Sequence, residues 1–169
     1  MDQDKEKNIE FIDKLKLFYV EQKINIILIC STFILILVVF AVAMFFQERK
    51  NILISEKFIK ANIFLSLENK DKSKELYEEI IKSKNKFYSI LALNMILEKG
   101  LENNEDKIIK YFDILQSLSI PSDQKDLLIF KKALYLIQIS KTEEGKNLLR
   151  KLSNSESFLK NISNQILEN

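Results

Sequence analysis

Residues 24–46 read INIILICSTFILILVVFAVAMFF, a stretch of twenty-three residues without a charged side chain. At about 1.5 Å per residue, a helix of this length reaches roughly 35 Å, which is enough to cross a hydrocarbon core of about 30 Å. A soluble protein would have to cover such a helix on every face, and a chain of 169 residues has little protein left to do so. The stretch therefore predicts one transmembrane helix from Ile24 to Phe46, in contact with the lipid bilayer.

A cleavable signal peptide is the competing interpretation of the same stretch. Ala41-Val42-Ala43 supplies the A-x-A triplet that precedes a cleavage site. The triplet, however, lies inside the apolar stretch, with Met44, Phe45 and Phe46 after it, and the stretch is longer than a typical signal-peptide core. We therefore favour an uncleaved anchor.

The segment before the anchor, residues 1–23, predicts an amphipathic helix. Its apolar residues recur at helical spacing, at Ile9, Ile12, Leu15, Phe18 and Tyr19. This helix could lie among lipid headgroups, dock on a cytoplasmic partner or simply extend the anchor. Five lysines precede the anchor and four basic residues follow within fifteen positions, so the positive-inside rule barely distinguishes the two orientations. We expect the simpler arrangement, a short cytoplasmic tail with the longer C-terminal part on the other side.

The composition excludes several kinds of chemistry. The chain has no His and one Cys, Cys30, so it has no Ser-His or Cys-His nucleophile pair, no imidazole base and no internal disulfide. Its 26 Lys and Arg nearly balance 24 Asp and Glu, so no basic surface for nucleic acid is indicated. We expect no enzyme, no catalytic residue, no cofactor and no metal site.

The part after the anchor, residues 47–169, predicts a series of helices, because the whole chain has two Gly and one Pro. The expected helices are Ile52–Glu68, Asp71–Ser83, Phe87–Lys99, Glu105–Leu118, Asp123–Ser140, Thr142–Leu152 and Glu156–Leu167. Candidate N-caps are Asn69, Asp71, Asn104, Ser122, Thr142 and Ser155. Gly100 is a candidate left-handed C-cap, and Pro121 separates the fourth and fifth of these helices.

An internal repeat organises these helices. Residues 60–65 align without gaps over residues 132–137, an offset of 72, which is two units of 36. Residues 88–115 supply the middle unit, so we expect three helix-turn-helix units with the last helix as a polar-faced cap. Small residues lie opposite one another, Ala61 with Ser73 and Ala133 with Gly145, which predicts close helix packing. The expected repeat-packing residues are Ala61, Ser73, Tyr77, Ala92, Phe112, Ala133, Gly145 and Leu149.

The small and large positions of these units resemble the tetratricopeptide repeat. The order of parts is also informative: a tail ending in residues 15–23 (LKLFYVEQK), one anchor, and repeats that contain residues 85–92 (NKFYSILA). Together they resemble the bacterial YfgM family, ancillary subunits of the SecYEG translocon. The resemblance implies an all-α protein of the inner membrane, with a tetratricopeptide-like α-solenoid at 47–169 in the periplasm. It also implies association with the translocon and with periplasmic chaperones such as PpiD, in support of exported proteins.

Two surfaces are candidates for partner binding. In the repeat register the first helix of each unit lines an inner face, and the expected groove residues are Phe58, Asn62, Ser89, Leu93, Phe130 and Leu134. The alternative is that the apolar members simply form the core. Residues 82–86 (KSKNK) form a basic turn that could touch anionic headgroups or an acidic partner, or be a solvated loop.

We therefore expect a non-enzymatic, membrane-anchored scaffold that binds other proteins, with the translocon role implied by the resemblance. One alternative keeps the repeats but uses them in envelope assembly or division. Another is a small structural subunit of a membrane enzyme complex, in which the anchor matters more than the repeats.

Overall fold

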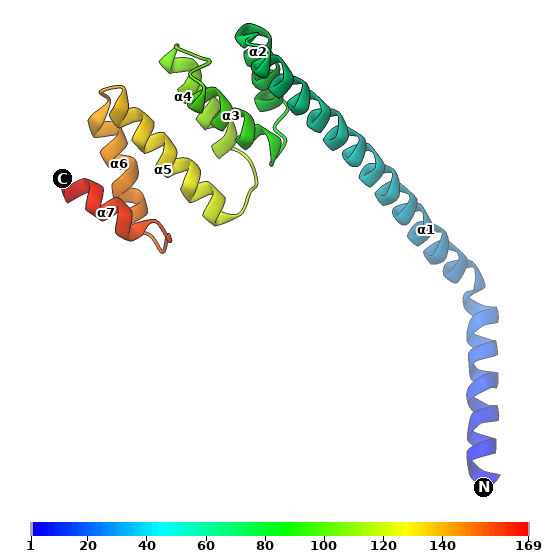
Figure 1. The fold of residues 1–169 in the computed structure, drawn as a ribbon. Helices are drawn as coiled ribbons and strands as arrows, with labels where there is room; N and C mark the ends of the chain where they lie inside the picture. The colour runs from blue at the N-terminus through cyan, green and yellow to red at the C-terminus, as the bar shows by residue number, and fades with distance from the viewer. Residues whose placement is uncertain (1, 169) are drawn as a thin grey trace. The chain divides into compact units, whose positions relative to one another are not determined.

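The computed structural model describes the backbone of residues 2–168 and the side chains of residues 22–25 and 27–168. Over these residues the protein is all-helical, without strands (Figure 1). The helices are α1 (Asp2–Ser66), α2 (Lys70–Lys82), α3 (Tyr88–Glu98), α4 (Glu105–Gln116), α5 (Ser122–Gln138), α6 (Thr142–Ser153) and α7 (Lys160–Glu168). The chain divides into two units, Met1–Lys50 and Asn51–Asn169.

The first unit consists of the N-terminal part of α1. Its apolar stretch is exposed along its length, with Ile24, Phe40 and Phe46 each more than 60% accessible. The segment Gln22–Ser66 is, by length and composition, a helix that could cross a membrane. The hydroxyls of Ser31 and Thr32 both donate to the Leu28 carbonyl, so these polar groups are satisfied within the helix. The side chains of residues 1–21, which carry the predicted amphipathic tail, lie outside the described residues.

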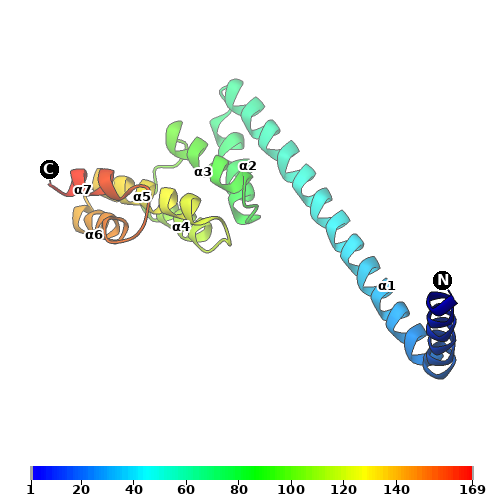
Figure 2. The same ribbon diagram turned by 90° about the horizontal axis from the view of Figure 1, so that it is seen from below.

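The second unit is built by successive helices that pack on one another (Figure 2). The last turns of α1 contact α2 and α3: the Tyr77 hydroxyl donates to Asn62 Oδ1 at 2.7 Å, and the Tyr88 hydroxyl donates to Ser55 Oγ at 2.8 Å. Further along, α2 packs on α3, α4 on α5, α5 on α6, and α6 on α7. The order of helices therefore follows the sequence, with each helix close to the one before it.

Two of the predicted N-caps are confirmed. The side chain of Asn69 accepts a hydrogen bond from the Lys72 N–H at 3.2 Å, and that of Asn104 accepts one from the Lys107 N–H at 3.0 Å. Gly100 has φ +58°, which confirms the predicted left-handed residue after α3. These local hydrogen bonds and the glycine explain why α2, α3 and α4 begin or end within about two residues of the expected positions.

Other predicted boundaries are wrong. Ser122 and Thr142 are the first residues inside α5 and α6, so the cap positions belong to Pro121 and Lys141. Helix α7 begins at Lys160 instead of Glu156. Serine hydroxyls compete for the backbone before it: the Ser157 N–H donates to Ser155 Oγ, and the Leu159 N–H donates to Ser157 Oγ. Asp71 lies inside the first turn of α2.

The buried apolar residues follow the chain in two groups. The larger core cluster runs from Ala61 to Leu128 and centres on the fully buried Tyr77 and Phe112. A second set on α5 and α6 comprises Ala133, Leu136, Leu149 and Leu152. All the residues expected to pack within the repeats, including Ser73, Ala92 and Gly145, are buried.

The contact between α5 and α6 is especially close at Gly145. A Cβ atom added there would lie 2.6 Å from the Ala133 carbonyl oxygen and 2.6 Å from Ile137 Cγ1. Only a residue without a side chain fits at these distances. Gly145 thus has a packing reason to occupy the interior of a helix, where glycine costs about 1 kcal/mol relative to alanine.

Candidate functional site

A groove lies between α3 and α5. Near the start of both helices it contains an apolar cavity of about 160 Å³. Its lining residues are Lys86, Phe87, Ile90, Leu91, Gln124, Leu127, Leu128 and Lys131. Most of this lining is apolar, and Lys86 and Lys131 are its two charged residues. The cavity is suited to an apolar side chain with an acidic neighbour.

A second cavity of about 450 Å³ lies toward the C-terminal ends of the same two helices. Its lining residues are Ile96, Leu97, Gly100, Glu102, Asn103, Glu105, Ile108, Lys131, Leu134, Tyr135, Gln138 and Ile139. It is larger and more polar than the first, and its carboxylates suit a basic neighbour. The two cavities together form one groove, which we call the α3/α5 groove.

Lys131 joins the two parts of the α3/α5 groove, because its side chain lines both cavities. Its Nζ donates to Asn94 Oδ1 on α3 at 2.8 Å, so this hydrogen bond crosses from one wall to the other. A partner that occupies the whole groove therefore has to pass over this bridge or replace it.

Of the predicted groove residues, only Leu134 lines this groove. Leu134 lines the larger cavity and remains 39% exposed. Phe130 is half-buried on α5 but lines neither cavity. The residues from α3 that line the groove are Ile90, Leu91, Ile96 and Leu97, which the sequence did not single out.

The expectation that Ser89 and Leu93 face a partner is corrected by their burial. Both are essentially inaccessible, at 0% and 1%, and the Ser89 hydroxyl donates to the Ile80 carbonyl at 2.8 Å. They lie on the face of α3 that packs into the core, together with Ala92 and Ile96. For Leu93 the structure supports the core position that the sequence left as the alternative, and Ser89 is buried as well.

Phe58 and Asn62 also point toward the core of the domain. The Phe58 ring packs against Tyr77 and Tyr88, with ring centroids 5.7 and 5.6 Å apart. Asn62 accepts the hydrogen bond from Tyr77 described above. Both side chains hold α1 against α2 and α3, so they stabilise the domain and are not part of the α3/α5 groove.

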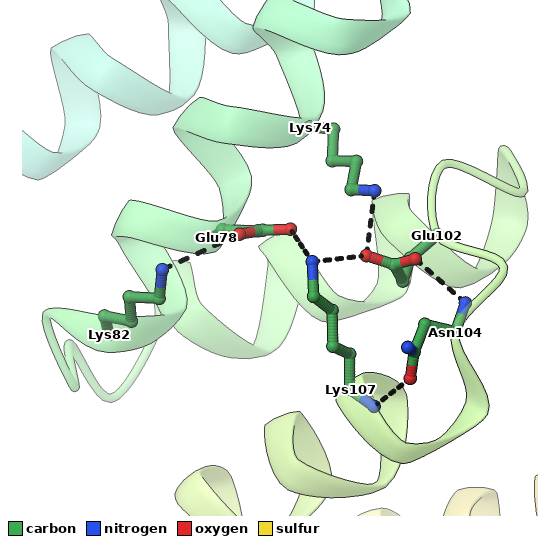
Figure 3. A network of polar contacts seen from close by, with 6 residues as sticks. All are labelled: Lys74, Glu78, Lys82, Glu102, Asn104 and Lys107. Carbon is green, nitrogen blue, oxygen red and sulfur yellow. Dashed lines mark hydrogen bonds and ion pairs between the residues drawn. The ribbon is translucent and has the colours of Figure 1, made fainter.

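A network of charged residues surrounds Glu102, which lines the larger cavity (Figure 3). Glu102, in the loop between α3 and α4, lies between the amino groups of Lys74 at 2.8 Å and Lys107 at 3.3 Å. Its Oε1 also accepts a hydrogen bond from the Asn104 N–H at 2.8 Å. The Glu102 side chain is 5% exposed, so its charge is buried but compensated on several sides.

These contacts change the proton affinity of the network. Burial alone would raise the pKa of Glu102, but the hydrogen bonds from Lys74, Asn104 and Lys107 outweigh it and lower the pKa to about 2. The same hydrogen bond to Glu102 raises the pKa of Lys74. Glu102 therefore remains ionised at every physiological pH and fixes the loop that forms the groove wall.

Glu102 was not recognised from the sequence. Its partners come from α2 and α4 and lie 28 and 5 residues away, and a hydropathy pattern carries no information about such pairs. The nearby cap, Asn104, was the available signal, since it marks the short loop in which Glu102 lies.

Among the residues whose side chains are described, no group of three or more His, Cys, Asp or Glu is arranged to hold a metal ion. The strongly perturbed carboxylate, Glu102, is held by lysines and a backbone N–H, an arrangement typical of structural ion pairs. The groove combines an apolar cavity with a larger, more polar one, and each has charged residues in its lining. No family model, curated protein or solved structure matches this chain.

Proposed function

We propose that this protein is a single-pass membrane protein whose C-terminal domain is a tetratricopeptide-like α-solenoid that binds other proteins in the α3/α5 groove. The observation that carries the proposal is the groove itself, with its apolar cavity of about 160 Å³ and its more polar cavity of about 450 Å³ on the helices that begin the second and third repeat units. In such arrays the first helix of each unit commonly lines the binding surface.

The anchor is supported by the exposure and composition of the apolar stretch. Its described side chains between Ile24 and Phe46 are exposed, and burying them in lipid removes a large apolar surface from water. The intrahelical hydrogen bonds of Ser31 and Thr32 leave no unpaired hydroxyl donor to be buried in hydrocarbon.

The repeat architecture is supported by the equivalent positions of its units. Ala61 and Ser73 are both buried, and so are Ala133 and Gly145, which occupy the same places 72 residues later. The close approach of Gly145 to the Ala133 carbonyl is the geometry that a small-residue pair permits. The helix order, with α7 packed on α6 at the end, fits a solenoid closed by a capping helix.

The partner that fits the groove is a protein segment with apolar side chains and charges of both signs. Lys131 favours an acidic neighbour at the smaller cavity, and Glu105 favours a basic one at the larger. In line with the resemblance, we propose an accessory subunit of the SecYEG translocon in the bacterial inner membrane. Residues 1–23 would then be cytoplasmic, and the repeats would meet chaperones such as PpiD in the periplasm.

The test is crosslinking in cells of the tagged full-length protein, followed by mild detergent extraction and mass spectrometry. The groove variants are Leu127→Asp and Leu134→Asp, at residues that are 40% and 39% exposed. The matched control is Ile162→Asp on α7, where the side chain is 44% exposed but lies outside the groove. Circular dichroism confirms that each variant is folded.

We expect the wild type and Ile162→Asp to recover translocon subunits and periplasmic chaperones, and both groove variants to lose the chaperones. Equal recovery by all four proteins would remove the groove from the proposal. Recovery of an envelope-assembly or division machine, or of a membrane enzyme complex, would replace the translocon with that partner.

A further inference from the structure

The loop between α2 and α3 combines positive charge with an exposed aromatic ring. Lys82, Lys84 and Lys86 alternate along it, and Phe87 at its end is 63% exposed. Lys82 lies 3.6 Å from Glu78, whereas Lys84 and Lys86 form no ion pair with any described residue. We call residues 82–87 the basic loop. It presents two uncompensated lysines beside a ring that is mostly in contact with solvent.

Hydrogen bonds fix the conformation of the basic loop. Asn85 Oδ1 accepts from the N–H groups of Phe87 at 3.1 Å and Tyr88 at 2.9 Å. The Asn85 Nδ2 donates to Asn51 Oδ1 at 2.8 Å, which ties the loop to α1. The Phe87 ring packs edge-on against Tyr88, with centroids 5.1 Å apart. The ring is thus held outward before any partner arrives, so little conformational entropy is lost on binding.

The same hydrogen bond ties the basic loop to a residue that follows the apolar stretch closely in the sequence. Asn51 follows Phe46 by five residues. Five residues span about 7.5 Å as a helix and at most roughly 17 Å when extended. The headgroup region is about 5–8 Å thick on each side, and its surface charge acts over a further Debye length of about 8 Å. Covalent connection alone therefore holds Asn51, and the loop bonded to it, within reach of a membrane surface.

We propose that the basic loop binds the anionic headgroups of the adjacent lipid leaflet, with Lys84 and Lys86 on the phosphates and Phe87 in the interfacial layer. This inference rests on the proposed function, because it requires the apolar stretch to lie in a membrane. Lysines beside an aromatic ring are a combination that favours an anionic interface, through charge attraction and burial of the ring. An acidic protein would satisfy the lysines but would not require the loop to be tied so close to Phe46.

The absence of Trp in the chain provides a direct test. Phe87→Trp creates a single tryptophan in the full-length protein, which is reconstituted in vesicles containing phosphatidylglycerol and brominated acyl chains. Phe158→Trp, at a ring that is 62% exposed between α6 and α7, is the matched solvent control. Phe40→Trp, at a ring that is 63% exposed within the apolar stretch, reports on the anchor. Both leaflets of such vesicles have the same lipids, so the direction of insertion does not affect the result.

We expect strong bromine quenching at positions 40 and 87 and none at position 158. Quenching at 40 without quenching at 87 would overturn the lipid contact and leave the anchor intact. Absence of quenching at 40 would instead contradict the membrane anchor on which both proposals depend. Loss of quenching at 87 together with crosslinking of that position to an acidic protein in cells would assign the loop to a protein partner.

The role of charge is tested in the Phe87→Trp protein with Lys84→Gln and Lys86→Gln. Each lysine near an anionic surface strengthens membrane binding by about fivefold. The two changes together should therefore lower the ratio of membrane-bound to unbound loop by about 25-fold. Vesicles of phosphatidylcholine alone should reduce quenching in the same way. Equal quenching in both kinds of vesicle would overturn the recognition of anionic lipid. The change Lys151→Gln, at an exposed lysine of α6, serves as the control for total charge.

Discussion

Replacement of Gly145 by alanine tests how closely α5 and α6 pack. Helix propensity alone predicts that the change stabilises the domain, whereas close packing predicts that it destabilises the domain. In an exposed helix interior, Gly→Ala stabilises by about 1 kcal/mol. Here the new Cβ would lie 2.6 Å from the Ala133 carbonyl oxygen, whereas ordinary contact begins at 3.4 Å. Because that oxygen belongs to the backbone, rotation of the Ile137 side chain can relieve only part of the clash, and α5 has to move away by about 0.8 Å.

Overpacking of this kind costs about 1–3 kcal/mol. Because the clash involves the backbone, the cost of Gly145→Ala should lie toward the upper end of this range. After the gain in helix propensity is subtracted, we expect the free energy of unfolding to fall by about 1–2 kcal/mol. For a domain of this size that lowers the melting temperature by about 4–8 °C. The measurement is thermal unfolding of the full-length protein in detergent, followed by circular dichroism.

The control is Lys151→Ala on the same helix, where the side chain is exposed. It should stay within about 0.5 kcal/mol of wild type. If Gly145→Ala raised the melting temperature instead, the two helices would not approach as closely as described, and the packing argument for the small-residue pair would be refuted.

Two further changes test the contacts around the groove and the core. Glu102→Gln should destabilise the domain by about 2 kcal/mol at neutral pH, because two lysines that remain partly exposed lose a buried carboxylate. Since the folded-state pKa of Glu102 is lowered to about 2, its contribution is present above about pH 4.5 and is lost as the pH falls toward 2; urea unfolding across this range should show a steeper loss of stability in wild type than in the variant. Tyr77→Phe keeps the buried ring but removes the hydrogen bond to Asn62, so we expect a loss of about 1 kcal/mol in the free energy of unfolding, and no change would mean that water replaces this hydrogen bond without cost.

Much of the helical order follows from the sequence because local signals and hydropathy agree. The low Gly and Pro content, the caps at Asn69 and Asn104 and the left-handed Gly100 place most helix ends close to where the structure has them. The separation expected between the anchor and a helix starting at Ile52 is wrong, because α1 continues through residues 47–51. Four of these five residues, Gln47 to Lys50, are good helix formers, and the segment contains no Gly or Pro to end a helix.

The groove was harder to predict for a physical reason that is visible in α3. Its sequence, YSILALNMILE, is apolar on nearly every face, so the pattern does not distinguish the side that enters the core from the side that lines a groove. The alignment of the repeat units predicted that Ser89 and Leu93 face outward, whereas the packing of α3 on α2 and α4 buries them. On α5, Leu134 lines the larger cavity as expected, whereas Phe130, which the repeat alignment also assigned to the groove, lines neither cavity.

The division of the buried residues into two groups has a consequence for how the domain opens. The larger cluster ends at Leu128, and the set on α5 and α6 begins at Ala133, so the boundary between them falls within α5, beside the groove. Repeat arrays lose structure unit by unit when neighbouring interfaces are weak, and native-state hydrogen exchange reports each unit separately. Amide protons of α6 and α7 should therefore exchange as one set, earlier than those around Tyr77 and Phe112. A chain seated in the groove contacts both sets, and its binding would raise the protection of the C-terminal helices toward that of the main core.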